Sequence, residues 1–155
     1  MRLQKATFAA GCFWGVEHAF RQIDGVTDAT CGYTGGHYEA PTYQDVCAGQ
    51  TGHAEAVELT FDADRISYKE LVEAFWQMHD ATTLNRQGPD LGSQYRSAIY
   101  CHSPEQEAAA LESRDDVQEQ LLDSIVTEIA PAAKFWRAED YHQEYFEKRG
   151  IAVCL

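Results

Sequence analysis

The sequence places a cysteine directly before two large aromatic residues, in the pentapeptide Gly11-Cys12-Phe13-Trp14-Gly15. A cysteine in the first turn of a helix lies near unpaired N–H groups and the positive end of the helix dipole, which favours its reactive thiolate form. Phe13 and Trp14 would form an apolar wall beside this sulfur, suited to a substrate with a small apolar group on the atom under attack. The alternative is a buried core thiol with packed aromatic neighbours, and the pentapeptide alone leaves both open.

A glutamate is predicted to face the apolar side of a strand. Alternation over residues 54–61 puts Glu55 on the same side as Val57, Leu59 and Phe61. A carboxyl group on an inward face must find a partner or stay protonated. With a raised pKa, Glu55 could hold a proton at neutral pH and act as a general acid. A solvent-exposed strand glutamate is the ordinary alternative.

The elements that would position these two residues alternate in type along the chain. The first six run in the order β-α-β-β-α-β, which is typical of a ferredoxin-like split βαβ core. We therefore expect an α+β fold with that core and a C-terminal extension, as a single domain over residues 1–155. Long loops are expected at 34–52 and 83–93. The strands are predicted at 3–10, 26–33, 54–61, 95–101 and 124–130, and the helices at 12–23, 67–79, 103–122 and 138–149.

Composition limits the class of protein and its partners. A chain of 155 residues can bury about 70% of its unfolded surface. Its 12 lysines and arginines against 25 aspartates and glutamates give a net charge of −13, which opposes binding to nucleic acid or to anionic membranes. We see no signal peptide and no apolar run long enough to cross a bilayer, and expect a cytoplasmic protein. The five cysteines contain no Cys-x-x-Cys pair, which argues against a disulfide framework and against a zinc site, and fits a reducing compartment.

Further motifs extend over nearly the whole chain. They are Gly32-Tyr33-Thr34-Gly35-Gly36, Pro41-Thr42-Tyr43, Gly52-His53-Ala54-Glu55-Ala56-Val57, and Gly92-Ser93-Gln94-Tyr95-Arg96-Ser97-Ala98-Ile99-Tyr100. With the pentapeptide around Cys12, and in this order, they make a sequence that resembles peptide methionine sulfoxide reductase A. The resemblance implies an oxidoreductase that reduces methionine-S-sulfoxide, free or in proteins, to methionine. Such an enzyme repairs proteins after oxidative stress.

The resemblance also implies roles for individual residues. Cys12 matches the nucleophile that attacks the sulfoxide sulfur, and Glu55 matches the acid that protonates the sulfoxide oxygen. Tyr43 and Tyr95 match tyrosines that hydrogen-bond this oxygen, and Asp90 matches an aspartate that helps to organise the site. Without the resemblance, each tyrosine would be read as structural and Asp90 as a turn residue.

The attack would leave a sulfenic acid on Cys12, which condenses readily with a second thiol. The C-terminal sequence around Cys154 looks like the family's recycling tail, so a redox-active Cys12–Cys154 disulfide is implied, with thioredoxin as its external reductant. Many members carry two recycling cysteines there, whereas this chain has one. Cys31, Cys47 and Cys101 could compete, although we interpret them as core or incidental thiols on or near strands. No other cofactor and no metal are expected, and we expect a monomer.

Three other functions are compatible with parts of the sequence. The tripeptide at 53–55 fits the His-x-Glu half of the zinc deaminase signature, but no Pro-Cys-x-x-Cys follows it. A cysteine hydrolase would pair Cys12 with a distant histidine such as His53 or His142. The non-enzymatic alternative is an acidic binding module whose aromatic side chains form a peptide-docking surface, namely Phe13, Trp14, Tyr38 and Tyr43.

Overall fold

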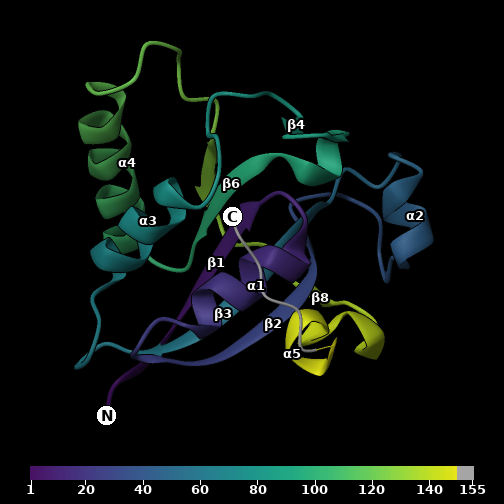
Figure 1. Cartoon of the computed structure of the whole chain (residues 1–155), viewed down its shortest axis with the longest axis horizontal. Helices are drawn as coiled ribbons and strands as arrows, with labels where there is room; N and C mark the ends of the chain where they lie inside the picture. The colour runs from purple at the N-terminus through teal and green to yellow at the C-terminus, as the bar shows by residue number, and fades with distance from the viewer. Residues whose placement is uncertain (150–155) are drawn as a thin grey trace.

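Six strands form one sheet in the order β7-β6-β1-β3-β2-β8 (Figure 1). The structure is a computed structural model and describes residues 1–149. The strands are β1 (Leu3–Ala10), β2 (Val26–Thr34), β3 (Ala54–Asp62), β6 (Ser97–Cys101), β7 (Glu128–Pro131) and β8 (Trp136–Arg137). The four central strands, in the order β6-β1-β3-β2, pair antiparallel with their neighbours. This arrangement confirms the predicted α+β fold with a ferredoxin-like core.

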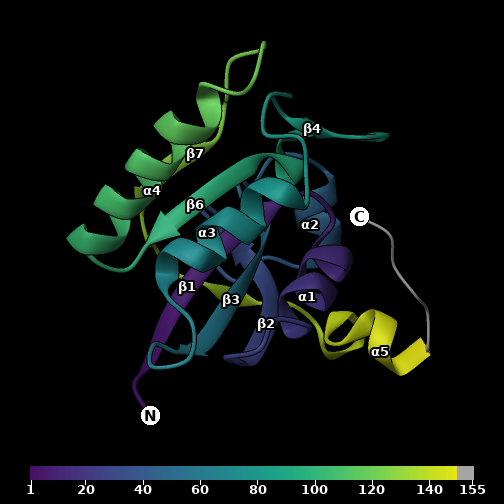
Figure 2. The same cartoon turned by 60° about the vertical axis from the view of Figure 1, so that its left-hand side comes forward.

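Two helices, α1 (Phe13–Arg21) and α3 (Tyr68–Gln77), lie over one face of this sheet (Figure 2). The core beneath them is aromatic, since the ring of Phe8 on β1 stacks on Phe20 of α1 at 5.0 Å and on Phe75 of α3 at 5.3 Å between ring centroids. A third helix, α4 (Pro104–Gln118), packs beside α3, where the Trp76 indole donates to the Ser113 hydroxyl at 2.9 Å.

Both predicted loops contain short elements. The segment at 34–52 includes the helix α2 (Tyr43–Cys47), which begins at a capping box of Thr42 and Asp45. The segment at 83–93 includes a hairpin of β4 (Arg86–Gln87) and β5 (Asp90–Leu91). Because a 3-10 turn follows at Ser93–Tyr95, β6 begins later than predicted.

The C-terminal segment departs most from prediction. A continuous helix over 138–149 is wrong, since the structure has a 3-10 turn at Asp140–His142 and the helix α5 only from Tyr145 to Arg149. The helix is interrupted because the Gln143 side chain takes the place of a strand beside β2. It accepts from the backbone N–H of Cys31 at 2.8 Å and donates to the Cys31 carbonyl at 2.9 Å. Among residues 1–149, no helix is both long and apolar enough to span a membrane.

Candidate active site

Cys12 lies at the turn where β1 ends and α1 begins. Gly11 adopts φ +98°, and a Cβ at this position would lie 2.8 Å from Cγ of Gln87, so glycine is required there. Cys12 is the N-cap of α1, and it makes no side-chain capping bond of the usual kind. Instead, the backbone N–H groups of Trp14 and Gly15 are directed at its sulfur. The predicted position of this thiol in the first turn of a helix is correct.

Glu55 approaches the same turn from β3. Its side chain is 1% exposed, as the alternation of the strand predicts. Its Oε1 atom accepts from the backbone N–H of Phe13 at 3.2 Å, while Oε2 is buried with no hydrogen-bond partner in the described part of the chain. Burial raises the pKa of Glu55 to about 8, against the Phe13 N–H that lowers it and with a smaller contribution from the charge of Asp90. The carboxyl group therefore carries a proton at neutral pH.

The thiolate of Cys12 is not favoured at rest. Burial, with the charges of Glu55 and Asp90, raises the pKa of the thiol to about 11, and the N–H groups of Trp14 and Gly15 lower it only in part. The expectation of a stabilised thiolate is wrong because the helix dipole is a weaker effect here than burial beside two carboxyl groups. Both the thiol and Glu55 hold their protons at neutral pH.

Tyr43, Tyr95 and Asp90 are brought to the same place by three different segments. Tyr95 ends the 3-10 turn before β6, and its pKa is raised to about 12 by burial and by the charges of Glu55, Cys47, Asp90 and Cys12. Tyr43 is the first residue of α2, and burial, the neighbouring Cys47 thiol and Glu55 raise its pKa. Asp90 on β5 lines a hollow of about 390 Å³ together with Cys12.

The two aromatic residues after Cys12 have different surroundings. Phe13 is 1% exposed and packs in the core against Tyr33, at 5.7 Å between ring centroids. Trp14 is half-buried and stacks on the ring of Tyr145 at 3.7 Å, and its indole N–H donates to Nδ1 of His142 at 2.9 Å. Of the two, Trp14 is therefore the one that can present an apolar wall.

Sequence reasoning missed Glu139, and it named His142 only as a possible hydrolase base and not for its packing in this site. His142 is 1% exposed, and its ring lies 4.5 Å from that of Tyr43 as well as against Trp14. Glu139 accepts from the Tyr33 hydroxyl and from the backbone N–H of Tyr43. The helical pattern read over 138–149 hid them, because the contacts that give them a role come from residues about a hundred positions away.

The two histidines proposed for other chemistry differ in how they are engaged: both ring nitrogens of His53 have partners, whereas Nε2 of His142 is buried with no hydrogen-bond partner in the described part of the chain. Nδ1 of His53 accepts from the backbone N–H of Gly36 at 3.0 Å, and Nε2 lies 2.6 Å from the Tyr38 carbonyl, so neither nitrogen is available to a metal or a thiol. His142 uses Nδ1 to accept from Trp14. Residues 1–149 contain no group of three or more side chains that could hold a metal ion.

The other cysteines separate into two kinds. Cys31 on β2 and Cys101 on β6 are buried, as a core interpretation requires. Cys47 is exposed at the end of α2 beside Tyr43, so its placement on or near a strand is wrong. Cys154 lies outside the described residues.

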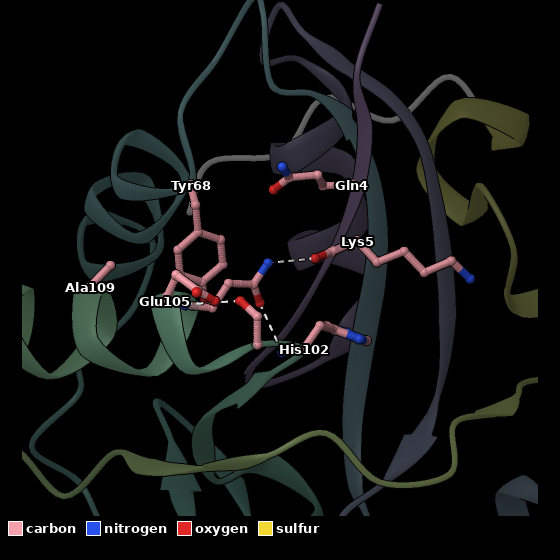
Figure 3. A pocket seen from close by; sticks show the side chains of 8 residues that line it. Gln4, Lys5, Tyr68, His102, Glu105 and Ala109 are labelled. Atoms are coloured by element: carbon pink, nitrogen blue, oxygen red, sulfur yellow. Dashed lines mark hydrogen bonds between the residues drawn. The ribbon is translucent and has the colours of Figure 1, made fainter.

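A second hollow, of about 480 Å³, lies at the opposite end of β1 (Figure 3). The Gln106 side chain in it pairs with backbone groups, whereas the Tyr68 hydroxyl is buried with no hydrogen-bond partner among residues 1–149. Gln106 accepts from the backbone N–H of His102 at 2.9 Å and donates to the Lys5 carbonyl at 2.8 Å. No cysteine lines it, so it offers no sulfur nucleophile.

Known proteins match the chain over almost its full length. A family model described as peptide methionine sulfoxide reductase matches residues 4–155. The chain is 60% identical over 155 residues to the peptide methionine sulfoxide reductase MsrA of Methanothermobacter thermautotrophicus, covering 99% of this chain and 92% of that protein. Its structure resembles methionine sulfoxide reductase A of Corynebacterium diphtheriae, with a TM-score of 0.93, 36% identity and coverage of 98% and 77% of the two chains. It also resembles Mxr1 of Saccharomyces cerevisiae solved in complex with Trx2, with a TM-score of 0.68, 26% identity and coverage of 93% and 85%.

Proposed function

The chain belongs to the peptide methionine sulfoxide reductase family, and from this membership we infer that it is an oxidoreductase that reduces methionine sulfoxide, free or in proteins, to methionine. The observation that carries the proposal is the protonated, buried carboxyl group of Glu55 beside the Cys12 thiol. A sulfoxide sulfur becomes electrophilic only when its oxygen is protonated or strongly hydrogen-bonded, and Glu55 can supply that proton. We propose that one domain over residues 1–155 carries the activity.

In the reducing step, the Cys12 sulfur attacks the sulfoxide sulfur while Glu55 donates its proton to the sulfoxide oxygen. The sulfur–oxygen bond of the substrate then breaks, and the new bond between the two sulfur atoms breaks as methionine leaves, so that the protonated oxygen ends on Cys12 as a sulfenic acid. The thiol proton of Cys12 restores Glu55, so no net proton is taken up or released. The sulfoxide sulfur gains two electrons and the Cys12 sulfur loses two.

The surrounding side chains hold the substrate in this step. The hydroxyls of Tyr43 and Tyr95 would donate to the sulfoxide oxygen as charge develops on it, and their raised pKa values keep them protonated. Trp14, supported by Phe13, would contact the methyl group of the substrate. Asp90 would help to keep a proton on Glu55 through its charge. We carry over the preference for the S epimer from the family alone.

Regeneration would use Cys154. Its thiol would attack the sulfenic sulfur of Cys12, forming a disulfide and releasing water. Reduced thioredoxin would exchange with this disulfide and leave oxidised, and the yeast relative solved with Trx2 supports that partner. The cycle needs no further cofactor, and we propose a monomer that binds thioredoxin and oxidised substrates, with no nucleic-acid or membrane partner.

Burst experiments with the variant Cys154→Ser test this proposal. The variant should release about one methionine per enzyme from methionine sulfoxide, because attack by Cys12 does not need Cys154. Turnover with thioredoxin should then collapse. Dimedone should label Cys12 of this variant after exposure to substrate, whereas the parent should form the Cys12–Cys154 disulfide and escape labelling.

Cys47→Ser is the matched control, since it also removes a cysteine other than Cys12 and should keep thioredoxin-dependent turnover. Full turnover by Cys154→Ser would show that another thiol, or direct reduction of the sulfenic acid, regenerates Cys12. A parent enzyme that releases no methionine would refute the reductase function itself.

A further inference from the structure

One carboxylate joins three segments that meet at the site. Glu139 lies between β8 and the 3-10 turn at Asp140–His142. Its Oε1 atom accepts from the Tyr33 hydroxyl at 2.8 Å, and Oε2 accepts from the backbone N–H of Tyr43 at 2.9 Å. The C-terminal segment, β2 and α2 are thus linked through a single side chain.

The Tyr33 end of this link is fixed. Tyr33 is fully buried on β2, and it is the cross-strand partner of Glu55 on β3. Its ring also packs against Phe13 in the first turn of α1. The hydrogen bond from the Tyr33 hydroxyl therefore fixes Glu139 relative to the strands and helix that hold Glu55 and Cys12.

The Tyr43 end is held by apolar packing and by one polar link. Val46 of α2 is buried in the core and the His142 ring packs against that of Tyr43, so the direct polar attachment of α2 is what Glu139 supplies. The helix α2 has only five residues and lies within the long connection between β2 and β3. Its capping box joins Thr42 and Asp45 to each other and attaches α2 to nothing else. Within residues 1–149, the bond to Glu139 is the one side-chain hydrogen bond between α2 and another element.

The charge of Glu139 makes this link strong. Burial would raise its pKa, but the backbone N–H groups of Tyr43 and of Glu139 itself and the Tyr33 hydroxyl outweigh it and hold the pKa below its ordinary value. The group is therefore ionised at neutral pH. Hydrogen bonds to an ionised acceptor are roughly twice as strong as those between neutral groups.

We propose that Glu139 is a positioning residue that sets where the Tyr43 phenol lies relative to Glu55 and so controls the rate of the sulfoxide-reducing step. The proposal rests on the proposed function, in which the Tyr43 hydroxyl donates to the sulfoxide oxygen. A shift of about 1 Å in such a donor can cost on the order of 100-fold in rate.

Single-turnover release of methionine from Glu139 variants tests this role. Glu139→Ala should slow the burst by about 10- to 100-fold and leave its amplitude at about one methionine per enzyme. Glu139→Gln should recover most of the rate, because the amide oxygen can accept from the Tyr43 N–H while the amide NH₂ donates to the Tyr33 oxygen. Asp140→Ala is the matched control, since the neighbouring carboxylate is 88% exposed, and it should keep the parent rate.

A double-mutant cycle separates positioning from general stabilisation. If Glu139 acts through the Tyr43 hydroxyl, Glu139→Ala should cause no further slowing in a Tyr43→Phe background. Equal slowing in both backgrounds would overturn the proposal, as would a parent rate in Glu139→Ala. If Glu139→Ala does not fold, Glu139→Asp serves instead, because it keeps the charge but is too short to reach both donors. A parent rate in Glu139→Asp would equally overturn the proposal.

Different measurements would overturn the positioning role of Glu139 and the reductase function. A burst of normal amplitude whose rate is insensitive to Glu139 overturns the positioning role and leaves the reductase function intact. A parent rate in Tyr43→Phe overturns the positioning role as well, since no phenol would then need placing. Loss of the burst in the parent enzyme overturns the reductase function.

Discussion

The helices α1 and α4 each begin directly after a strand, at opposite ends of β1. The hydrogen bonds in their first turns differ. At the start of α4, the Ser103 hydroxyl accepts from the backbone N–H of Gln106 at 3.1 Å. The Gln106 side chain accepts from the backbone N–H of His102 and donates to the Lys5 carbonyl. At the start of α1, Cys12 makes no such cap. Its first-turn N–H groups go to the Cys12 sulfur and to a carboxyl oxygen from β3.

This difference separates a stabilising helix start from a reactive one. The Gln106 N–H of α4 is paired with the neutral Ser103 hydroxyl, which stabilises the start of that helix. The donors of α1 face a thiol and a carboxyl group that both keep their protons, and one carboxyl oxygen has no partner among residues 1–149. The start of α1 thus holds two proton-bearing groups and one unpartnered carboxyl oxygen where a reacting molecule can meet them.

Cys12→Ser should cause the largest loss of activity, while the stability of the fold should be kept or increased. The serine hydroxyl is a far weaker nucleophile toward sulfur and cannot form a sulfenic acid, so methionine release should be undetectable. Serine is also a preferred N-cap, so the free energy of unfolding should stay equal or rise by up to about 1 kcal/mol. Urea unfolding beside the burst assay measures both. Methionine release by this variant would contradict the role of Cys12.

Glu55→Gln should slow the reducing step by on the order of 100-fold at pH 7, because the amide cannot donate a proton as an acid. In the parent, the proposed step begins with protons on both Cys12 and Glu55. Its rate should therefore be flat below the Glu55 pKa of about 8 and fall about tenfold per pH unit above it. The variant should lack this fall. Glu58→Gln, on the solvent side of the same strand, is the control and should follow the parent profile.

The same variant should change how stability depends on pH. Burial raises the pKa of Glu55 from 4.5 to about 8, so between these values the folded protein keeps a proton that the unfolded chain releases. The contribution of Glu55 to the free energy of unfolding should therefore fall as pH rises through this window, by up to about 1.4 kcal/mol per unit. Glu55→Gln should gain stability relative to the parent from pH 5 to pH 8. A constant difference in urea midpoints would show that Glu55 titrates normally.

Local patterns predicted the parts of the site that depend on local geometry. The inward direction of Glu55 follows from the two-residue period of a strand, and the position of Cys12 follows from the boundary between a strand and a helix. The capping box of Ser67 and Glu70, where the predicted helix at 67–79 begins, is a local feature of the same kind. Each of these features is fixed by residues within a few positions of one another.

Features set by distant contacts were not predictable in the same way. The helix dipole at Cys12 was read correctly, but the pKa of the thiol is decided by burial and by Glu55, which lies 43 positions further along. The break at 143 depends on the backbone of Cys31, and Glu139 gains its partners only when β2 and α2 meet. A helical pattern contains no information about such partners.

Ser103→Ala should give the smallest effect and confine it to stability. Removing the hydroxyl leaves the Gln106 N–H without its cap, which should cost about 1 kcal/mol in the free energy of unfolding. Ser103→Cys places a cysteine at the N-cap of α4, as Cys12 is at the N-cap of α1. It should lower the free energy of unfolding by a similar amount, since sulfur is a weak acceptor. Ser103→Asp keeps a capping oxygen and should retain the parent stability. None of the three should change the burst rate, because α4 begins at the far end of β1 from Cys12. A slower burst in the two destabilised variants, with a parent rate in Ser103→Asp, would show that the two helix starts are coupled through the sheet.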